Sequence, residues 1–248
     1  MQAETTIVIS YNDYSCAWEN YASALTIENS YRIGSNLAVY AARGRNSLTM
    51  AQVIHNGDWS CDPGAVENLR DGIVSRTGLT TNLLSAINPN TTVLDNVDLL
   101  ILFGHDGFSF LQSGLNNIKA FLDRGGVIFA DDCNANPNGT FASSWRSVIQ
   151  SLYSVNFTDL TPDNPFFNTF YQLSGDNASF SSTGYGTEWG QNRLQGISVY
   201  TPTLEEGLQS WQVPEPASLV FLGMGILVSC CLFKKNVSYV SSKRFDKE

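Results

Sequence analysis

The sequence predicts an α/β domain in which helices cover both faces of a parallel sheet, followed by one C-terminal transmembrane helix. Three observations predict this arrangement. Between about residues 48 and 152, apolar strand-like segments alternate with amphipathic segments of helical length. Some strand-like segments are apolar throughout, which is typical of strands buried on both faces. Near the end, the seventeen residues Ala217–Phe233 carry no charge and are followed by Lys234 and Lys235.

The first element is a strand at Thr5–Ser10, because this segment is rich in β-branched residues. Residues 11–46 are rich in Tyr, Asn and Ser and have no clear period, so we expect an extension whose pairing stays open. The regular part begins with a strand at Leu48–Ile54 and a helix at Pro63–Arg76, which has proline at its start.

The second half continues the alternation of strands and helices. We expect a strand at Val97–Phe103, a helix from about Gln112 to Asp123, a strand at Val127–Ala130 and a helix from Phe141 to Leu152. Two glycines, Gly125 and Gly126, end the first of these helices. The chain is therefore divided into an N-terminal strand and extension (1–47), the main α/β domain (48–211) and a C-terminal segment (212–248).

Polar clusters follow three of the predicted strands. Asn56–Trp59 comes after the first, Gly104–Phe108 after the second and Asp131–Asn134 after the third. The carboxyl ends of parallel strands lie at one edge of the sheet, and ligands bind beyond that edge. His55 and His105, the two histidines of the chain, both lie at or beside these strand ends.

His105 is a candidate catalytic residue, because the glycines on either side of it let the backbone approach a ligand. A hydrogen-bonded structural histidine is the alternative. Asp131 and Asp132 are the other catalytic candidates. Beside His105 and Asp106, their carboxylates could bind Mg²⁺ or Ca²⁺ through oxygen, or could serve as acid and base. Alternatively, one caps the next helix and the other pairs with Arg146.

The remaining polar residues at this edge are candidates for ligand binding: His55, Asp58, Trp59, Asp106 and Arg146. Trp59 and Phe108 could stack on a sugar ring or simply cover the sheet. The Gly- and Ser-rich segment Ser174–Gly190 is suited to lying over the cleft, or is a surface loop. No cofactor is indicated by the sequence.

Three cysteines lie in the main part of the chain, at Cys16, Cys61 and Cys133. There is no CxxC pair, so we expect no structural zinc site and assign no metal. A disulfide among the three is allowed outside the cytoplasm, and the odd number leaves one thiol free.

The charge distribution separates the body from the tail. Residues 1–216 carry a net charge of -12, and the tail from Lys234 carries +3. Phosphate backbones would repel so acidic a body, which argues against a nucleic-acid partner.

The uncharged segment 217–233 would be about 25 Å long as a helix, at the lower edge of what crosses a bilayer core. A buried core helix is the alternative, although such helices usually have a polar face. The lysines that follow it predict a cytoplasmic tail and a body on the outer side of the membrane. Together with Pro214, Glu215 and Pro216, this segment resembles the PEP-CTERM sorting signal of Gram-negative bacteria. The resemblance implies an exosortase, a membrane transpeptidase, as partner, and transfer to the cell surface. The chain departs from that pattern in continuing beyond the basic cluster, to Glu248.

A second resemblance covers roughly Leu48–Trp211, in an ordered series of blocks. The main part resembles domain-of-unknown-function family 4159 in the blocks at Asn56–Leu69, "LLILFGHDGF" at Leu99–Phe108, "FLDRGGVIFADDC" at Phe121–Cys133, "F..SWR" at Phe141–Arg146 and "DNPFFNTFY" at Asp163–Tyr171. The resemblance implies a flavodoxin-like fold similar to class I glutamine amidotransferases. Asn164 stands where the resemblance leads us to expect a histidine.

In the amidotransferases a cysteine at a strand-to-helix turn works with a histidine and a glutamate from later in the chain. Cys133 lies near such a turn, but no histidine follows it. We therefore expect a surface-directed, membrane-anchored domain that binds a ligand or partner and is not a working amidotransferase. Two alternatives stay open: a hydrolase of cell-envelope or extracellular polysaccharide that uses His105 with Asp131 or Asp132, and a structural protein of a biofilm matrix.

Overall fold

A computed structural model describes residues 4–160, 164–173 and 194–199, and the side chains of 4–6 and 194–199 are not described. The chain divides into two units, Met1–Gln212 and Val213–Glu248. All described residues belong to the first unit. The predicted transmembrane helix 217–233, the sorting motif and the segment Ser174–Gly190 lie outside them. No helix among the described residues is long and apolar enough to cross a membrane.

The first unit is built on a sheet with the strand order β3-β2-β4-β5-β1-β7-β6. The first five strands of this order are parallel to one another, which confirms the predicted parallel sheet. They are β3 (Thr80–Leu83), β2 (Ser47–Gln52), β4 (Leu99–Gly104), β5 (Val127–Asp132) and β1 (Glu4–Ser10). The sequence did not predict β3, at one edge of the sheet. It also did not predict β7 (Leu194–Val199), which pairs antiparallel with β1, or β6 (Thr158–Asp159), which pairs antiparallel with β7.

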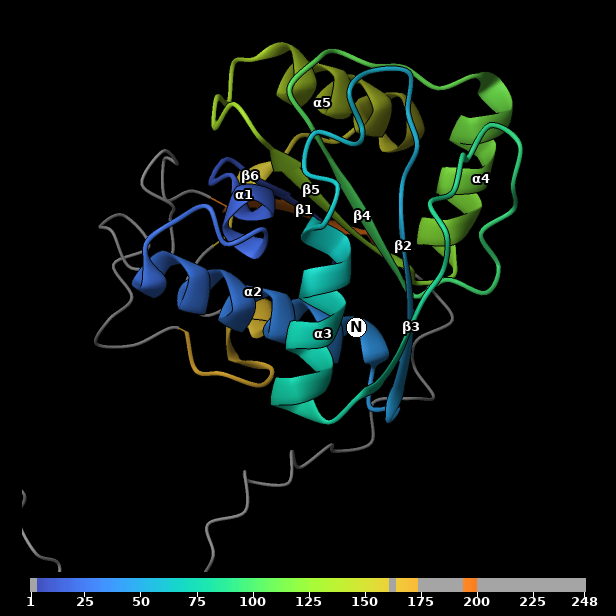
Figure 1. Ribbon diagram of the computed structural model, residues 1–248. Coiled ribbons are helices and arrows are strands. Elements are labelled where there is room, and N and C mark those ends of the chain that lie inside the picture. Colours follow the sequence, from blue (N-terminus) through green and yellow to red (C-terminus); the bar gives the residue numbers. More distant parts are fainter. Residues whose placement is uncertain (1–3, 161–163, 174–193, 200–248) are drawn as a thin grey trace, which may run out of the picture. The chain divides into compact units, whose positions relative to one another are not determined.

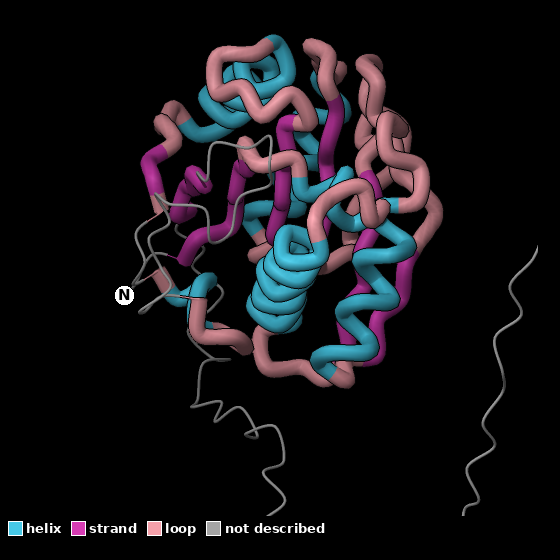
Figure 2. The backbone as a smooth tube through the Cα atoms, turned by 60° about the vertical axis from the view of Figure 1, so that its left-hand side comes forward, coloured by secondary structure: helices cyan, strands magenta, loops and turns pink. Residues whose placement is uncertain are grey.

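Helices cover both faces of the sheet (Figure 1). One face carries α1 (Tyr14–Trp18), α2 (Ala24–Ala42), α3 (Ala65–Thr77) and the short 3-10 helix η1 (Pro165–Asn168), and the other carries α4 (Gln112–Asp123) and α5 (Thr140–Tyr153). Figure 2 shows the same layers from another side. The two faces hold separate apolar clusters, with Val8 and Phe129 facing α2 and α3, and Ile9 and Ile128 facing α4 and α5. This alternation is what a period of two in β-strands requires.

Most elements lie where the sequence places them, but residues 11–46 are not an irregular extension. They form α1 and α2, and Ser23 caps α2 by accepting a hydrogen bond from the Thr26 N–H at 3.2 Å. The sequence signal was weak because α2 contains Thr, Ser, Asn and Gly, which have low helix propensity. Burial of Ile33 and Leu37 against the sheet stabilises the helix instead.

The order of the strands creates a switch point between β2 and β4. The chain leaves β2 through α3 towards β3 at one edge, whereas it leaves β4 through α4 towards β5 on the other side. Two neighbouring strands thus send their carboxyl-terminal loops in opposite directions. A crevice at such a point is where ligands bind in open α/β sheets.

Candidate functional site

An aspartate–histidine pair lies at the switch point. His105, directly after β4, and Asp58, in the loop after β2, approach with 2.6 Å between His105 Nδ1 and Asp58 Oδ2. The other carboxylate oxygen, Oδ1, accepts hydrogen bonds from the backbone N–H groups of His105 and Asp106, each at 2.9 Å. The side chain of His105 is 44% exposed. Asp58 therefore fixes the imidazole ring while leaving part of it open to solvent.

Electrostatics favour an ionised Asp58. Burial alone would raise its pKa, but the hydrogen bonds from Asp106 and His105 outweigh that effect and lower the pKa. An ionised carboxylate is an acceptor only, so the ring of His105 carries its proton on Nδ1. The second nitrogen, Nε2, is then unprotonated when the ring is neutral, and can take up a proton.

Glycine at position 104 makes room for this pair. A Cβ atom built at Gly104 would lie 2.9 Å from Asp58 Oδ1 and 3.3 Å from His55 Cε1. Both distances are shorter than ordinary van der Waals contacts, so a side chain would displace the carboxylate. The glycines around His105 were expected to allow close approach of a ligand, whereas at Gly104 the close neighbour is Asp58.

His55 has a different, structural environment. Its ring is buried, with Nε2 3.1 Å from the carbonyl oxygen of Phe103 and Nδ1 accepting the Gly57 N–H at 3.1 Å. It also packs against Phe108, with ring centroids 4.5 Å apart. Burial lowers the pKa of His55, which keeps the ring neutral. In this structure His55 supports the two loops at the switch point and is enclosed by protein.

The other predicted site residues are spread along the same edge. Asp106 is exposed, and Trp59 is half-buried. Arg146, on α5, donates to the hydroxyl of Tyr11 at 2.7 Å and to the carbonyl of Pro137. Its hydrogen bonds therefore hold two loops together, and no contact with Asp131 or Asp132 is among them.

Asp131 and Asp132 are both fully buried at the end of β5. Asp131 Oδ2 accepts the Ser15 N–H at 2.9 Å, and Asp132 Oδ1 accepts the Asn134 N–H at 2.9 Å, within the turn that leads into α5. Burial is the main cause that raises the pKa of Asp131 to about 8 and of Asp132 to about 6. The carboxyl groups lie beneath the surface, and the carboxylate that forms a hydrogen bond with the His105 ring is that of Asp58.

Three thiols that the sequence left unconnected converge beside the aspartate–histidine pair. Cys61 Sγ lies 3.3 Å from Cys133 Sγ, and both lie close to Asp62 Oδ2, at 3.4 and 3.5 Å. Cys16 Sγ approaches the other oxygen, Asp62 Oδ1, at 3.5 Å. These cysteines follow β1, β2 and β5, so only the fold brings them together. Hydrogen bonding to Cys61 and burial both raise the pKa of Cys133, so without a bound cation this thiol is protonated.

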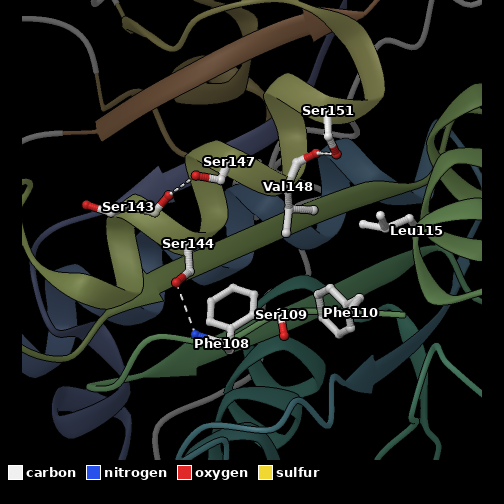
Figure 3. A pocket seen from close by; sticks show the side chains of 9 residues that line it. All are labelled: Phe108, Ser109, Phe110, Leu115, Ser143, Ser144, Ser147, Val148 and Ser151. Carbon is white, nitrogen blue, oxygen red and sulfur yellow. Dashed lines mark hydrogen bonds between the residues drawn. The ribbon is translucent and has the colours of Figure 1, made fainter. Parts of the chain in front are cut away.

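An open groove adjoins the loop that carries His105 (Figure 3). Its volume is ≈ 420 Å³, and it is lined by Phe108, Ser109, Phe110 and Leu115 on one side and by Ser143, Ser144, Ser147, Val148 and Ser151 of α5 on the other. Ser144 Oγ accepts the Phe108 N–H at 3.0 Å, which joins the two walls. Aromatic rings and hydroxyl groups together suit a sugar, which has an apolar face and many hydroxyls.

The model of a family described as "Domain of unknown function (DUF4159)" matches residues 49–209, more than half of the chain. The chain belongs to this family. Among curated proteins, no relative matches the chain.

The DUF4159 match begins inside β2, yet β1 and α2 from before it complete the sheet and its cover. The block at Asp163–Tyr171 contains Phe166 and Phe167, which are fully buried in η1 against α2. Asn164, at the position where a histidine was expected, accepts the Phe166 N–H at 3.0 Å through its side chain. In this chain the residue therefore caps η1.

Sequence reasoning placed His105 and Asp58 at one edge but did not pair them, and it missed Asp62 and the convergence of the thiols. A usable signal was present, because each of the three cysteines follows a predicted strand of the parallel sheet. A position after a strand indicates the edge of the sheet at which a residue lies. Contact also depends on how each loop folds, which the spacing of the residues does not show.

Proposed function

We propose that this chain is a hydrolase that removes ester-linked acyl groups from cell-envelope or extracellular polysaccharide, with His105 as general base. The observation that carries the proposal is the 2.6 Å contact between His105 Nδ1 and Asp58 Oδ2, at a ring that stays 44% exposed. A carboxylate that orients a histidine and stabilises its protonated form is a recurrent feature of acyl-transfer sites.

The reaction needs few groups. Nε2 of His105 takes a proton from a water molecule as the water oxygen attacks the ester carbonyl carbon. Asp58 stabilises the imidazolium that forms. The same proton then passes to the oxygen of the leaving alcohol as the ester bond breaks, so that acid and alcohol are released. The base ends the cycle unprotonated on Nε2.

We propose an ester bond and not a glycosidic bond as the target because of where the carboxyl groups lie. Cleavage of a glycosidic bond ordinarily uses two carboxyl groups that flank the bond. Asp131 and Asp132, the adjacent pair at this edge, are fully buried. The groove lined by Phe108 and Phe110 supports the assignment of a sugar, since it adjoins the loop of His105.

The proposal includes the location of the protein. It is supported by Pro214, Glu215 and Pro216, the uncharged segment 217–233 and the lysines that follow. This order is that of a PEP-CTERM signal, so the body would lie outside the cytoplasm on a single-pass anchor until an exosortase processes the tail. An acidic body and a basic tail agree with that orientation.

We also propose that the domain is flavodoxin-like. If the parallel strands are counted from β2, their spatial order reads 2-1-3-4, with β1 in the fifth place. This is the order of flavodoxin-like sheets. It supports a flavodoxin-like, amidotransferase-like domain in which the N-terminal strand fills the last position.

A binding module without turnover is the second candidate, and one observation favours it. Among the described residues, no hydroxyl or thiol forms a hydrogen bond with His105 Nε2, so a nucleophile would have to come from water or substrate. A structural role in a biofilm matrix is a variant of this candidate. Deletion of residues 213–248 would then release the protein with its fold unchanged.

The test is acetate release from an acetylated extracellular polysaccharide by the full chain in mild detergent. We expect turnover by the parent protein, its loss in His105→Gln, and polysaccharide binding retained in that variant. Lys119→Gln, an exposed change on α4, is the matched control and retains turnover. If the parent protein binds polysaccharide but releases no acyl group from it or from simple esters, the hydrolase is excluded and the binding module stands.

A further inference from the structure

We propose that the thiol cluster beside the switch point is a zinc site, with Cys61, Cys133 and Asp62 as its protein ligands. The proposal rests on the positions of three atoms, Cys61 Sγ, Cys133 Sγ and Asp62 Oδ2, and it is independent of the proposed hydrolase activity. None of the three residues was predicted from the sequence to bind a metal.

The three atoms are spaced as ligands of one ion. Their separations are 3.3 Å between the two sulfurs, and 3.4 and 3.5 Å from the sulfurs to the oxygen. Thiolate and carboxylate ligands of tetrahedral Zn²⁺ lie about 2.3 and 2.0 Å from the metal, which puts them about 3.5–3.8 Å apart. The observed triangle is therefore close to one face of the tetrahedron, and a small outward movement of the sulfurs completes it.

Buried carboxyl groups surround the cluster, and a bound cation would stabilise their ionised forms. Asp13, Asp62, Asp131 and Asp132 are all buried in this region, and none of them forms an ion pair with a lysine or arginine within the described ranges. The carboxyl oxygens Asp13 Oδ1, Asp131 Oδ1 and Asp132 Oδ2 have no hydrogen-bond partner there. Asp13, which is 6% exposed, lies with Cys16 and Asp62 in a second group whose ligand atoms are within 4.8 Å of one another.

The kind of metal follows from the ligands. Two sulfurs favour Zn²⁺ over Mg²⁺ or Ca²⁺, which prefer oxygen ligands alone. Binding releases the two thiol protons to solvent and leaves two thiolates and a carboxylate on the ion. Three protein ligands leave the fourth position open, as in zinc sites where water or a substrate binds. Cys61 also lies within 4.8 Å of ligand atoms of Asp58 and His105, so that open position would be near the proposed base.

A disulfide between Cys61 and Cys133 is the competing outcome, since their sulfurs are already 3.3 Å apart. The position of Asp62 favours the metal. A disulfide needs no carboxylate, whereas Asp62 Oδ2 is nearly equidistant from both sulfurs. Cys16 contacts the opposite oxygen of Asp62 and supplies a matched control, a cysteine beside the cluster that is outside the ligand set.

The experiment uses the full chain in mild detergent, purified with reductant, loaded with Zn²⁺ and freed of excess metal by gel filtration. We expect one zinc per chain in the parent protein and in Cys16→Ser. Stoichiometric binding is lost in Cys61→Ser and in Cys133→Ser, and weakened in Asp62→Asn. Circular dichroism of each variant shows whether it is folded.

A second measurement does not depend on the variants. Co²⁺ added to the reduced parent protein should give a thiolate-to-metal charge-transfer band and tetrahedral visible bands, and Zn²⁺ should displace them. The proposal is overturned if the reduced protein takes up no zinc and gives no such bands. It is also overturned if the protein isolated without reductant contains a Cys61–Cys133 disulfide and its reduced form binds no more zinc than Cys61→Ser.

Discussion

Replacing Asp58 by asparagine tests the pair at the switch point most severely, because the change keeps the shape and removes the charge. The asparagine oxygen can still accept from the two backbone N–H groups, but its NH₂ group then faces His105 Nδ1. Since two donors cannot share a hydrogen bond, the imidazole proton must move from Nδ1 to Nε2. The variant therefore keeps the loop and loses the base.

The magnitude follows from the contacts. A hydrogen bond to a charged group contributes about 1.5–3 kcal/mol when buried. The side chains of His105 and Asp58 are 44% and 31% exposed, so solvent screening limits the cost of making the Nδ1 hydrogen bond neutral to about 1 kcal/mol. Two backbone hydrogen bonds at 2.9 Å become neutral and lose about half of their strength. The free energy of unfolding should fall by about 2 kcal/mol in total.

Urea unfolding of the full chain in mild detergent measures this loss, with Asp106→Asn as control. Asp106 is exposed and only its backbone N–H contacts Asp58, so that variant should stay within about 0.5 kcal/mol of the parent protein. Acyl-group release by Asp58→Asn should fall about 10⁴-fold, as when the orienting carboxylate of a serine protease is amidated. Unchanged stability together with unchanged turnover would refute the reasoning.

Three further predictions address the surroundings of the site. Gly104→Ala places a methyl group 2.9 Å from Asp58 Oδ1, so it should lower the free energy of unfolding by about 1–3 kcal/mol and reduce turnover. A crystal structure of the variant with Asp58 unmoved would contradict this. Asn36→Ala removes hydrogen bonds to the backbone of Phe166 and Tyr171 at 2.7 to 3.1 Å, so urea unfolding should show a loss of about 2–4 kcal/mol and limited proteolysis should cut near residue 170. The pKa of His55 is lowered in the fold, so its contribution to stability is present above pH ~6.5 and is lost as the pH falls below it. His55→Gln should abolish this acid-dependent part, although the variant starts less stable. Parallel curves of unfolding free energy against pH for the two proteins would contradict the assignment.

The His55 measurement relies on the difference between two pH curves. The carboxyl groups of Asp13, Asp131 and Asp132 have raised pKa values in the fold, mainly through burial. They favour folding more strongly as the pH falls, which is opposite in sign to the effect of His55. They are present in both proteins, so subtraction removes them.

The parts of the fold that could be predicted are those with a local pattern. The apolar periodicity of Gln112–Asp123 gave the bounds of α4, and the continuous apolar segment at Val127–Ala130 gave most of β5. α2 was missed because the residues that stabilise it are spread among polar ones. Gly34 in that helix lets Leu69 of α3 approach closely, a contact that no sequence pattern announces.

The sequence predicted the edge of the sheet at which the candidate site lies, but it did not predict the contacts within the site. The rule for parallel sheets placed Asp58 and His105 beyond the same strand ends, and the structure confirms that proximity. It also predicted a cleft position for Asp131 or Asp132, but the carboxyl groups turn inward to meet the N–H groups of Ser15 and Asn134. Which way a strand-end side chain turns depends on the neighbouring loop, which is contributed by a distant part of the chain.

The tautomers of the two histidines test the central claim most directly. With only His55 and His105 in the chain, nitrogen NMR of protein labelled in histidine gives two sets of signals, and His55→Gln assigns them. We expect His105 to carry its proton on Nδ1, facing Asp58, and His55 to carry it on Nε2, facing the Phe103 carbonyl. If neutral His105 is protonated on Nε2 instead, Asp58 does not orient it and His105 is not the base.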